Sequence, residues 1–197
     1  MGWSGRAQEI VRADYGNADR GRPLNSVIRG SVSRPSAFGI FAALLCVAAA
    51  FVVLSGSALP PLVASHFAAS GTADRFMPRV AYLVFMVGAT VGVPLVLVLS
   101  HGLLRFVPPR FINLPNREYW LAPERSAATV AFLRSHSARF ASLLVVFLCF
   151  VHWLVVKANT LQPPRLAVRS FIAGLLLFLV AAVVWLGTLL GHFRRCP

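Results

Sequence analysis

Hydrophobic residues in this chain are concentrated in four long runs, and polar residues separate the runs. The runs cover residues 37–55, 80–104, 140–156 and 171–190, and none of them contains Asp, Glu, Lys or Arg. A helix of about 20 residues rises by about 30 Å, which is the thickness of the hydrocarbon core of a bilayer. The pattern therefore predicts an all-α integral membrane protein with four transmembrane helices.

The polar stretches set the domain organisation. Residues 1–36 contain six arginines and three acidic residues among Gly, Ser, Asn and Pro, a composition that disfavours a packed core. We expect a largely disordered tail over residues 1–36 and a single four-helix membrane domain over residues 37–197. The composition agrees with a membrane protein, since 57% of residues are hydrophobic and 13% are charged, against about 25% charged in soluble domains.

Positive charge is unequally distributed between the two sides that such a chain presents. The N-terminal tail, residues 105–139 and the C-terminal tail hold 14 of the 19 Lys and Arg residues, and the two remaining loops hold five. Because Lys and Arg near membrane helices favour the cytoplasmic side, we expect both termini and the central loop in the cytoplasm. We expect no nucleic-acid partner, since the cations do not alternate with aromatics along a folded face.

The second run has two features of its own. Gly88 and Gly92 lie four residues apart, a spacing that lets another helix approach closely, so a homo-oligomer packed through these glycines is one prediction. Pro94 cannot donate a backbone hydrogen bond and predicts a kink. His101 and His152 lie near the ends of their runs, and we expect each to make a local hydrogen bond at the membrane interface.

The loop between the first two runs carries a small group of polar residues. His66, Asp74 and Arg75 flank Gly71, which suits a turn with positive φ, and they could meet across that turn. One interpretation is a polar site for a ligand or metal, or a membrane enzyme that uses His66 and Asp74. The other is a compact loop whose Phe67 dips into the interface. One His and one Asp are too few for a metal site without further donors, so we predict no metal or cofactor.

The central loop predicts an amphipathic helix that runs toward, or into, the third transmembrane helix. Pro123 suits the first turn of a helix, and Glu124 beside it favours the positive end of the helix dipole. Tyr119 and Trp120 are expected at the level of the lipid headgroups before this helix. Ion pairs are expected between the acidic and basic side chains of this loop, namely Glu118 or Glu124 with Arg110, Arg117 or Arg125.

Sequence patterns typical of catalysis are absent. The chain contains no HExxH, no GxSxG and no phosphate-binding glycine loop. Its three cysteines fall in no metal-binding or CxxC spacing. These observations favour a protein that is not an enzyme.

Two segments resemble motifs of a known family. The segment LPPLVASHFAASGTADRF, residues 59–76, resembles the LP…HF-x-x-x-G-x-x-D-x-aromatic motif of a bacterial membrane-domain family of unknown function, which also supplies the N-terminal part of SdpI-like toxin-immunity proteins. The segment NLPNREYWLAPER, residues 113–125, resembles a second block of small members. Ala68 stands where many members have a polar residue. The matching positions are Leu59, Pro60, His66, Phe67, Gly71, Asp74, Phe76, Asn113, Leu114, Pro115, Asn116, Tyr119, Trp120, Pro123, Glu124 and Arg125.

These patterns predict a non-enzymatic, multi-pass inner-membrane protein that binds a peptide, a lipid or a partner protein. The resemblance implies envelope stress, signalling or toxin immunity as its setting. The alternatives are a small oligomeric transporter or a subunit of a membrane complex, and the membrane enzyme or metal site described above. The residues expected to contribute to binding are His66, Phe67, Gly71, Asp74, Asn113, Pro115, Asn116, Tyr119, Trp120, Pro123, Glu124 and Arg125.

Overall fold

The computed structural model describes residues 37–108 and 111–194. The tail expected over residues 1–36 and the side chain of Arg110 lie outside these residues. The described chain is mostly helical, and four of its helices are long and apolar enough to cross a membrane. The prediction of four membrane-spanning helices is thus confirmed at the level of helix length and composition.

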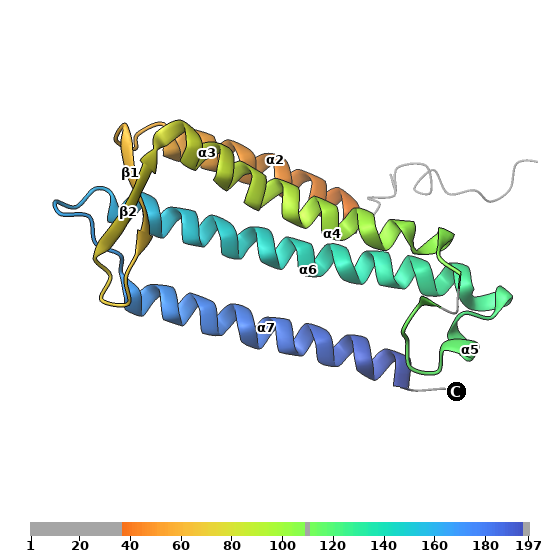
Figure 1. Ribbon diagram of the computed structural model, residues 1–197. Coiled ribbons are helices and arrows are strands. Elements are labelled where there is room, and N and C mark those ends of the chain that lie inside the picture. Colours follow the sequence, from red (N-terminus) through yellow and green to blue (C-terminus); the bar gives the residue numbers. More distant parts are fainter. Residues whose placement is uncertain (1–36, 109–110, 195–197) are drawn as a thin grey trace, which may run out of the picture. The chain divides into compact units, whose positions relative to one another are not determined.

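The long helices form a bundle with a short hairpin at one end (Figure 1). The long helices run side by side, with α6 between α7 on one side and α2 and α4 on the other. In chain order the elements are α2 (Ala37–Gly56), β1 (Leu62–Phe67), β2 (Ala73–Pro78), α3 (Arg79–Val87), η2 (Gly88–Gly92), α4 (Val93–Gly102), η3 (Leu103–Phe106), α5 (Arg117–Trp120), α6 (Pro123–Ala158) and α7 (Val168–Arg194).

The two ends of the bundle contain different elements. The hairpin end comprises β1, β2 and residues 159–167, which connect α6 to α7. The loop end comprises η3, α5 and the residues between them and α6. The described residues of the two predicted motifs fall at opposite ends, residues 59–76 at the hairpin end and residues 113–125 at the loop end (Figure 1).

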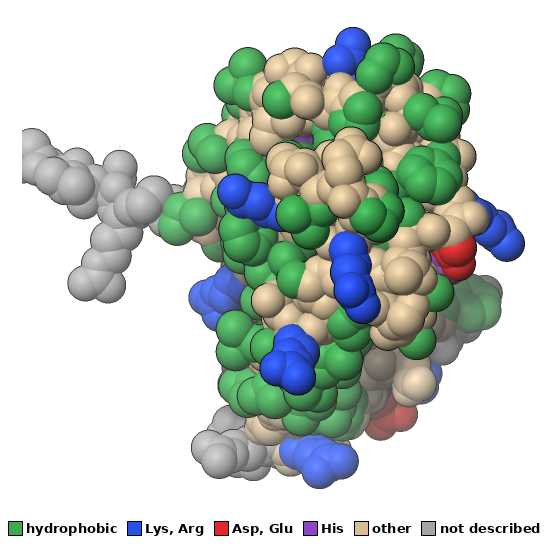
Figure 2. Space-filling view, turned by 90° about the vertical axis from the view of Figure 1, so that its left-hand side faces the viewer, with side chains coloured by type: hydrophobic (Ala, Val, Ile, Leu, Met, Phe, Trp, Pro, Cys, Tyr) green, Lys and Arg blue, Asp and Glu red, His purple; other side chains and the backbone are tan. Residues whose placement is uncertain are grey.

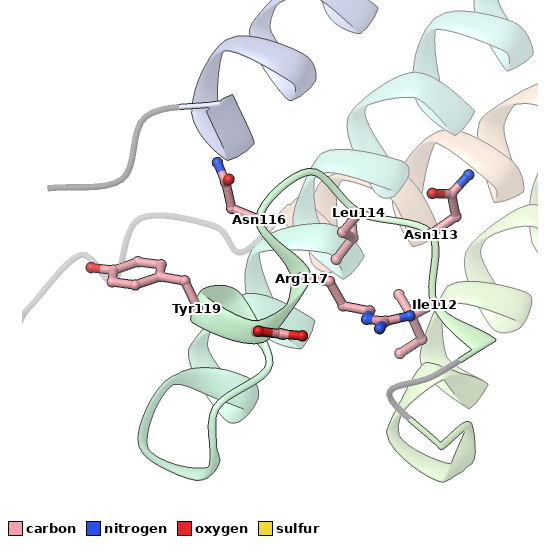
Figure 3. Close-up of a pocket in the computed structure, with 7 residues that line it drawn as sticks. Ile112, Asn113, Leu114, Asn116, Arg117 and Tyr119 are labelled. Atoms are coloured by element: carbon pink, nitrogen blue, oxygen red, sulfur yellow. The ribbon is translucent and has the colours of Figure 1, made fainter.

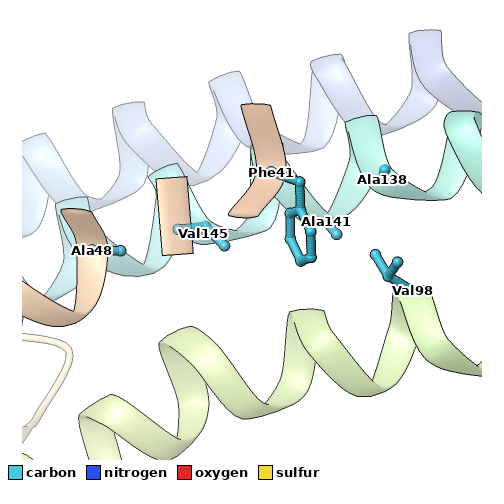
Figure 4. Packing of buried hydrophobic residues seen from close by; sticks show 6 residues of the cluster. All are labelled: Phe41, Ala48, Val98, Ala138, Ala141 and Val145. Carbon is cyan, nitrogen blue, oxygen red and sulfur yellow. The ribbon is translucent and has the colours of Figure 1, made fainter. Parts of the chain in front are cut away.

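Helix α6 forms most of the buried core. Near the middle of the bundle, Phe41 of α2 and Val98 of α4 pack against Ala138 and Ala141 of α6, whose small side chains are fully buried (Figure 4). A second apolar cluster toward the hairpin end joins α2, β1, α3 and α6. Since lipid tails are as apolar as these side chains, close packing rather than water exclusion is what holds such helices together. The second cluster consists of Val52, Leu59, Val63, Tyr82, Met86 and Val155.

The second spanning helix, Arg79–Ser100, is interrupted by a π-helical turn, η2. The cause is Pro94, which has no N–H to offer the carbonyl four residues earlier. The backbone widens instead, and Val93 donates its N–H to the carbonyl of Gly88. The structure thus has a π turn beside Pro94, and the predicted kink stays a prediction. A Cβ atom built on Gly88 or Gly92 would meet no atom within 4 Å, so neither glycine packs against the described chain, and the predicted homo-oligomer stays a prediction.

Helix α6 is continuous over 36 residues, a length of about 54 Å, which exceeds the hydrocarbon core of about 30 Å. The amphipathic helix expected to run toward or into the third span is therefore the first part of α6 itself. As predicted, Pro123 occupies the first turn and Glu124 lies beside it.

The predicted all-α class is incomplete, because residues 62–78 form a two-stranded antiparallel sheet rather than an irregular loop. In β1 the side chains of Val63 and Ala64 are fully buried between the exposed Leu62 and the half-buried Ser65. The segment lies between two strongly apolar runs. Because its strands are short, the periodicity of the sequence did not distinguish them from those runs.

A buried polar lock joins three helices near the hairpin end. The hydroxyl of Ser55 in α2 donates to the carbonyl of Phe51 at 2.5 Å. It must then accept a hydrogen bond from Nε2 of His152 in α6, which lies 2.9 Å away. The hydroxyl of Tyr82 in α3 donates to Nδ1 of the same ring at 2.9 Å. His152 is fully buried, and both of its partners lie far away in the sequence. The prediction that it forms a local hydrogen bond at the membrane interface is therefore wrong.

We expect His152→Ala to lower the free energy of unfolding by about 1–3 kcal/mol, because it leaves the buried hydroxyl of Tyr82 and the half-buried hydroxyl of Ser55 without their shared partner. Unfolding followed by circular dichroism during titration of sodium dodecyl sulfate into detergent micelles measures this change. His66→Ala is the matched control, since its side chain is 62% exposed. Equal unfolding midpoints for the two variants would contradict the role of the lock.

Candidate functional site

The hairpin at the hairpin end is closed by a tight turn. Strands β1 and β2 pair from Leu62 opposite Pro78 to Phe67 opposite Ala73, with irregular register around His66. Gly71 has φ of 83°, a conformation that residues with a Cβ rarely adopt. The N–H of Ala68 donates to the carbonyl of Thr72 at 2.9 Å. The glycine expected at a positive-φ turn is therefore confirmed.

His66 and Asp74 meet across the hairpin, as the sequence predicted. Nδ1 of His66 lies 2.6 Å from Oδ1 of Asp74, and the two side chains are 62% and 44% exposed. The hydrogen bond from His66 is the main cause that lowers the pKa of Asp74 below its ordinary value. An exposed pair of this kind contributes little to stability. Within the described residues no group of three or more His, Cys, Asp or Glu side chains could hold a metal ion.

Asn159 fixes the hairpin to the helical bundle. Its Oδ1 accepts the N–H of Ala64 at 2.8 Å, and its Nδ2 donates to the carbonyl of Ala64 at 3.0 Å and to that of Val155 at 2.9 Å. The side-chain amide thus pairs with the backbone of β1 much as a neighbouring strand would. The sequence reasoning missed this residue, although an Asn directly after a long apolar helix is a recognisable signal of a capping role.

Two further contacts hold the hairpin from other sides. The N–H of Leu166 donates to the carbonyl of Gly71 at 2.8 Å, and Thr72 forms an isolated β-bridge with Arg165. A Cβ atom at Gly71 would lie 2.6 Å from the carbonyl oxygen of Leu166, so this approach requires glycine. The guanidinium of Arg79 donates to the carbonyls of Ser57 and Leu59 at 3.1 and 2.9 Å. The hairpin is therefore a clamped element rather than a free loop.

One edge of this small sheet is open. Within the described residues the sheet has two strands, and its only continuation is the bridge from Thr72 to Arg165. Most side chains of β2 are exposed, Asp74, Arg75 and Phe76 among them. Figure 2, which faces the hairpin end, shows Lys and Arg side chains scattered among hydrophobic ones. An open strand edge beside exposed charges offers backbone hydrogen bonds to another chain.

The loop end caps the last turn of α7. Nδ2 of Asn116 and Nε1 of Trp120 both donate to the carbonyl of Phe193, each at 3.1 Å. The hydroxyl of Thr129 in α6 donates to the carbonyl of Trp120 at 2.8 Å. The last carbonyls of a helix have no partner within it, so these side chains satisfy one of them. Asn116 and Trp120, expected as binding residues, thus serve to join the central loop to α7.

The remaining candidates at the loop end have varied surroundings. The guanidinium of Arg125 lies 4.0 Å from the ring centroid of Tyr119, a cation–π contact. Neither Glu118 nor Glu124 forms an ion pair with an arginine that the structure describes, so the expected carboxylate–arginine pairs are not found there. Asn113 is exposed, and Pro115 lies in the turn before α5.

A column of stacked rings, which the sequence reasoning did not identify, joins α7 to α6 and α5. Neighbouring ring centroids in the column lie 3.9–5.4 Å apart. Two reciprocal hydrogen bonds accompany it: Nε2 of His136 donates to the carbonyl of Trp185 at 3.1 Å, and Nε1 of Trp185 donates to the carbonyl of His136 at 3.0 Å. The signal was a set of aromatic and His residues at helical spacing. In order, the rings belong to Trp185, His136, Phe132, His192 and Trp120.

Comparison of the chain with protein-family models, with curated proteins and with solved structures finds no match. The family suggested by the two motifs therefore stays a prediction, and the candidate site rests on the geometry described above.

We expect Asn159→Ala to release the hairpin while the helices stay folded. Losing three hydrogen bonds to buried backbone groups should raise amide exchange in residues 62–67 by about tenfold or more. Hydrogen–deuterium exchange read by mass spectrometry measures the change peptide by peptide. Asn113→Ala, at an exposed position of the loop end, is the control, and equal exchange of residues 62–67 in both variants would disprove the clamp.

Proposed function

We propose that this chain is a non-enzymatic, multi-pass protein of a bacterial cytoplasmic membrane that binds an extended segment of a partner protein along the open edge of β2. The observation that carries the proposal is the clamped hairpin with one strand edge unpaired within the described chain. The motif resemblance suggests envelope stress, signalling or toxin immunity as the setting.

The orientation that goes with this proposal places the hairpin outside the cell. Both termini and the central loop lie in the cytoplasm, because those segments hold 14 of the 19 Lys and Arg residues. The amphipathic first part of α6 then lies on the cytoplasmic side. The hairpin end faces the extracytoplasmic space, where secreted or periplasmic partners are found.

The open edge of β2 suits an extended peptide by strand addition. In that mode, backbone hydrogen bonds supply affinity, and alternating side chains supply specificity. The chain itself begins such an arrangement, since Arg165 pairs with Thr72 at the start of this edge. Asn159 and the Leu166–Gly71 contact hold the hairpin in place before binding, which reduces the entropy cost of association.

The charged side chains near the hairpin indicate which kind of partner segment would bind. The hairpin end and the helix ends next to it have a single carboxylate, Asp74, against five cations, and the side chain of Arg79 donates to backbone carbonyls. Exposed charges on an edge strand disfavour pairing with unrelated chains. A segment with an acidic residue opposite Arg75 matches this surface. The five cations are Arg75, Arg79, Lys157, Arg165 and Arg169.

A binding role is favoured over catalysis by the chemistry of the buried lock. Ser55, His152 and Tyr82 have the connectivity of a nucleophile, a base and an orienting group. The hydroxyl proton of Ser55 is donated to Phe51, however, so His152 is the donor in its bond with Ser55 and has no lone pair there to remove that proton. The lock therefore holds helices together.

Cysteine labelling tests the orientation. In a cysteine-free background, Ala69→Cys at the hairpin and Ala128→Cys near the start of α6 place one thiol each at exposed positions. We expect a membrane-impermeant maleimide to label position 69 in intact spheroplasts, and to label position 128 only after lysis. The reverse pattern would invert the topology and remove the outward-facing site.

Site-specific photo-crosslinking tests the binding edge. Replacing Phe76 by p-benzoylphenylalanine keeps an aromatic side chain on β2 at a position that is 49% exposed. We expect a discrete protein adduct after irradiation of native membranes, and at least severalfold less of it when Arg75→Glu reverses the neighbouring charge. The control places the same photoreactive residue at Leu177 of α7, which is 72% exposed. Absence of an adduct at position 76, or the same adduct at both positions, would refute the proposal.

A further inference from the structure

The loop end contains a pocket that neither the hairpin nor the lock explains. Its volume is about 510 Å³, and it is lined by consecutive parts of the central loop and α5 (Figure 3). Figure 3 shows the side chain of Arg117 extending from α5 toward Ile112, whereas Asn116 points away toward the end of α7. The lining residues are Ile112, Asn113, Leu114, Asn116, Arg117, Glu118 and Tyr119.

The backbone around the pocket is held in place by side chains that form hydrogen bonds outside the pocket. Asn116 has the left-handed backbone conformation, with φ of 52°, and its side chain is committed to the carbonyl of Phe193. Trp120 binds the same carbonyl and is itself held by Thr129. Since these bonds set the course of the chain from both sides of Arg117, the pocket is formed before any ligand arrives.

The pocket lies at the depth of lipid headgroups. The second spanning helix ends at Ser100, and the pocket lining begins 12 residues later at Ile112. The aromatic side chains of Phe106 and Phe111 in between are 68% and 67% exposed. Exposed aromatics beside a transmembrane span favour the region where acyl chains meet the headgroups.

Among the described residues, the lining carries one charge of each sign. The guanidinium of Arg117 presents several donors suited to a phosphate. The carboxylate of Glu118 is exposed and forms no ion pair with any residue that the structure describes. Asn113 adds a neutral hydrogen-bonding group. A ligand with a phosphate and a primary ammonium a few bonds apart matches this combination, whereas a purely anionic ligand would face the carboxylate.

We propose that the pocket binds a phosphoethanolamine group, with the phosphate on Arg117 and the ammonium on Glu118. At this depth the expected source is the headgroup of phosphatidylethanolamine, and soluble phosphoethanolamine has the same chemistry. The site is independent of the partner proposed for the hairpin, because it lies at the other end of the bundle.

Native mass spectrometry of the full-length protein, released from lipid nanodiscs, tests the assignment. Nanodiscs contain phosphatidylglycerol mixed with either phosphatidylethanolamine or phosphatidylcholine, whose quaternary ammonium cannot donate hydrogen bonds. We expect wild-type protein to retain phosphatidylethanolamine over phosphatidylcholine. Glu118→Gln should reduce that preference by roughly three- to tenfold, the effect of one exposed charge-assisted contact. Arg117→Gln should reduce retention of both lipids.

Matched controls remove the same charges outside the pocket. Glu124→Gln and Arg139→Gln alter exposed residues that do not line it, and we expect wild-type retention from both. Addition of soluble phosphoethanolamine distinguishes the sources: displacement of the lipid at low millimolar concentration assigns the site to the free compound, and resistance assigns it to the lipid. Equal retention of the two lipids by wild-type protein, or an unchanged preference in Glu118→Gln, overturns the proposal.

Discussion

Polar side chains on α6 connect this helix to almost every other part of the fold. Thr129 binds the central loop, His136 binds α7, and His152 binds α2 and α3, while Asn159, which caps the C-terminal end of α6, binds β1. In the hydrophobic region of a membrane, apolar packing alone distinguishes poorly between neighbours, because lipid tails offer the same contacts. A hydrogen bond between buried polar groups has a specific partner and geometry. The order of elements around α6 therefore depends on these four residues.

The same constraint explains why the ends of the bundle are structured. Backbone groups that lie outside regular helices near a membrane must still find partners. At the hairpin end, the amide of Asn159 and the guanidinium of Arg79 satisfy backbone groups of residues 57–64. At the loop end, Asn116 and Trp120 satisfy the last turn of α7. Each end is consequently rigid enough to present a defined surface, which is what recognition of a partner or a headgroup requires.

The two motif-bearing segments have different roles in this arrangement. At the hairpin end, the His66–Asp74 pair and the edge of β2 face outward, while the contacts that fix the hairpin come from residues elsewhere in the chain. At the loop end, part of the motif is structural and part lines a pocket. A single shared site for both segments is not possible, since the long helices separate them (Figure 1).

The sequence alone determined the features that depend on local chemistry. Four uncharged runs predict four spans, Pro94 predicts a disturbance of the second helix, Pro123 predicts a helix start, and Gly71 predicts the turn that brings His66 to Asp74. The strands escaped this reasoning because residues 62–67 and 73–78 mix apolar, small and charged side chains and show no distinct alternation. Tertiary structure decided which polar residues meet. Asn159 binds Ala64, 95 residues away in the sequence, and His152 binds Ser55, 97 residues away. Such pairs form because of the way the helices pack. A local pattern of hydrophobic and polar positions contains no information about that packing.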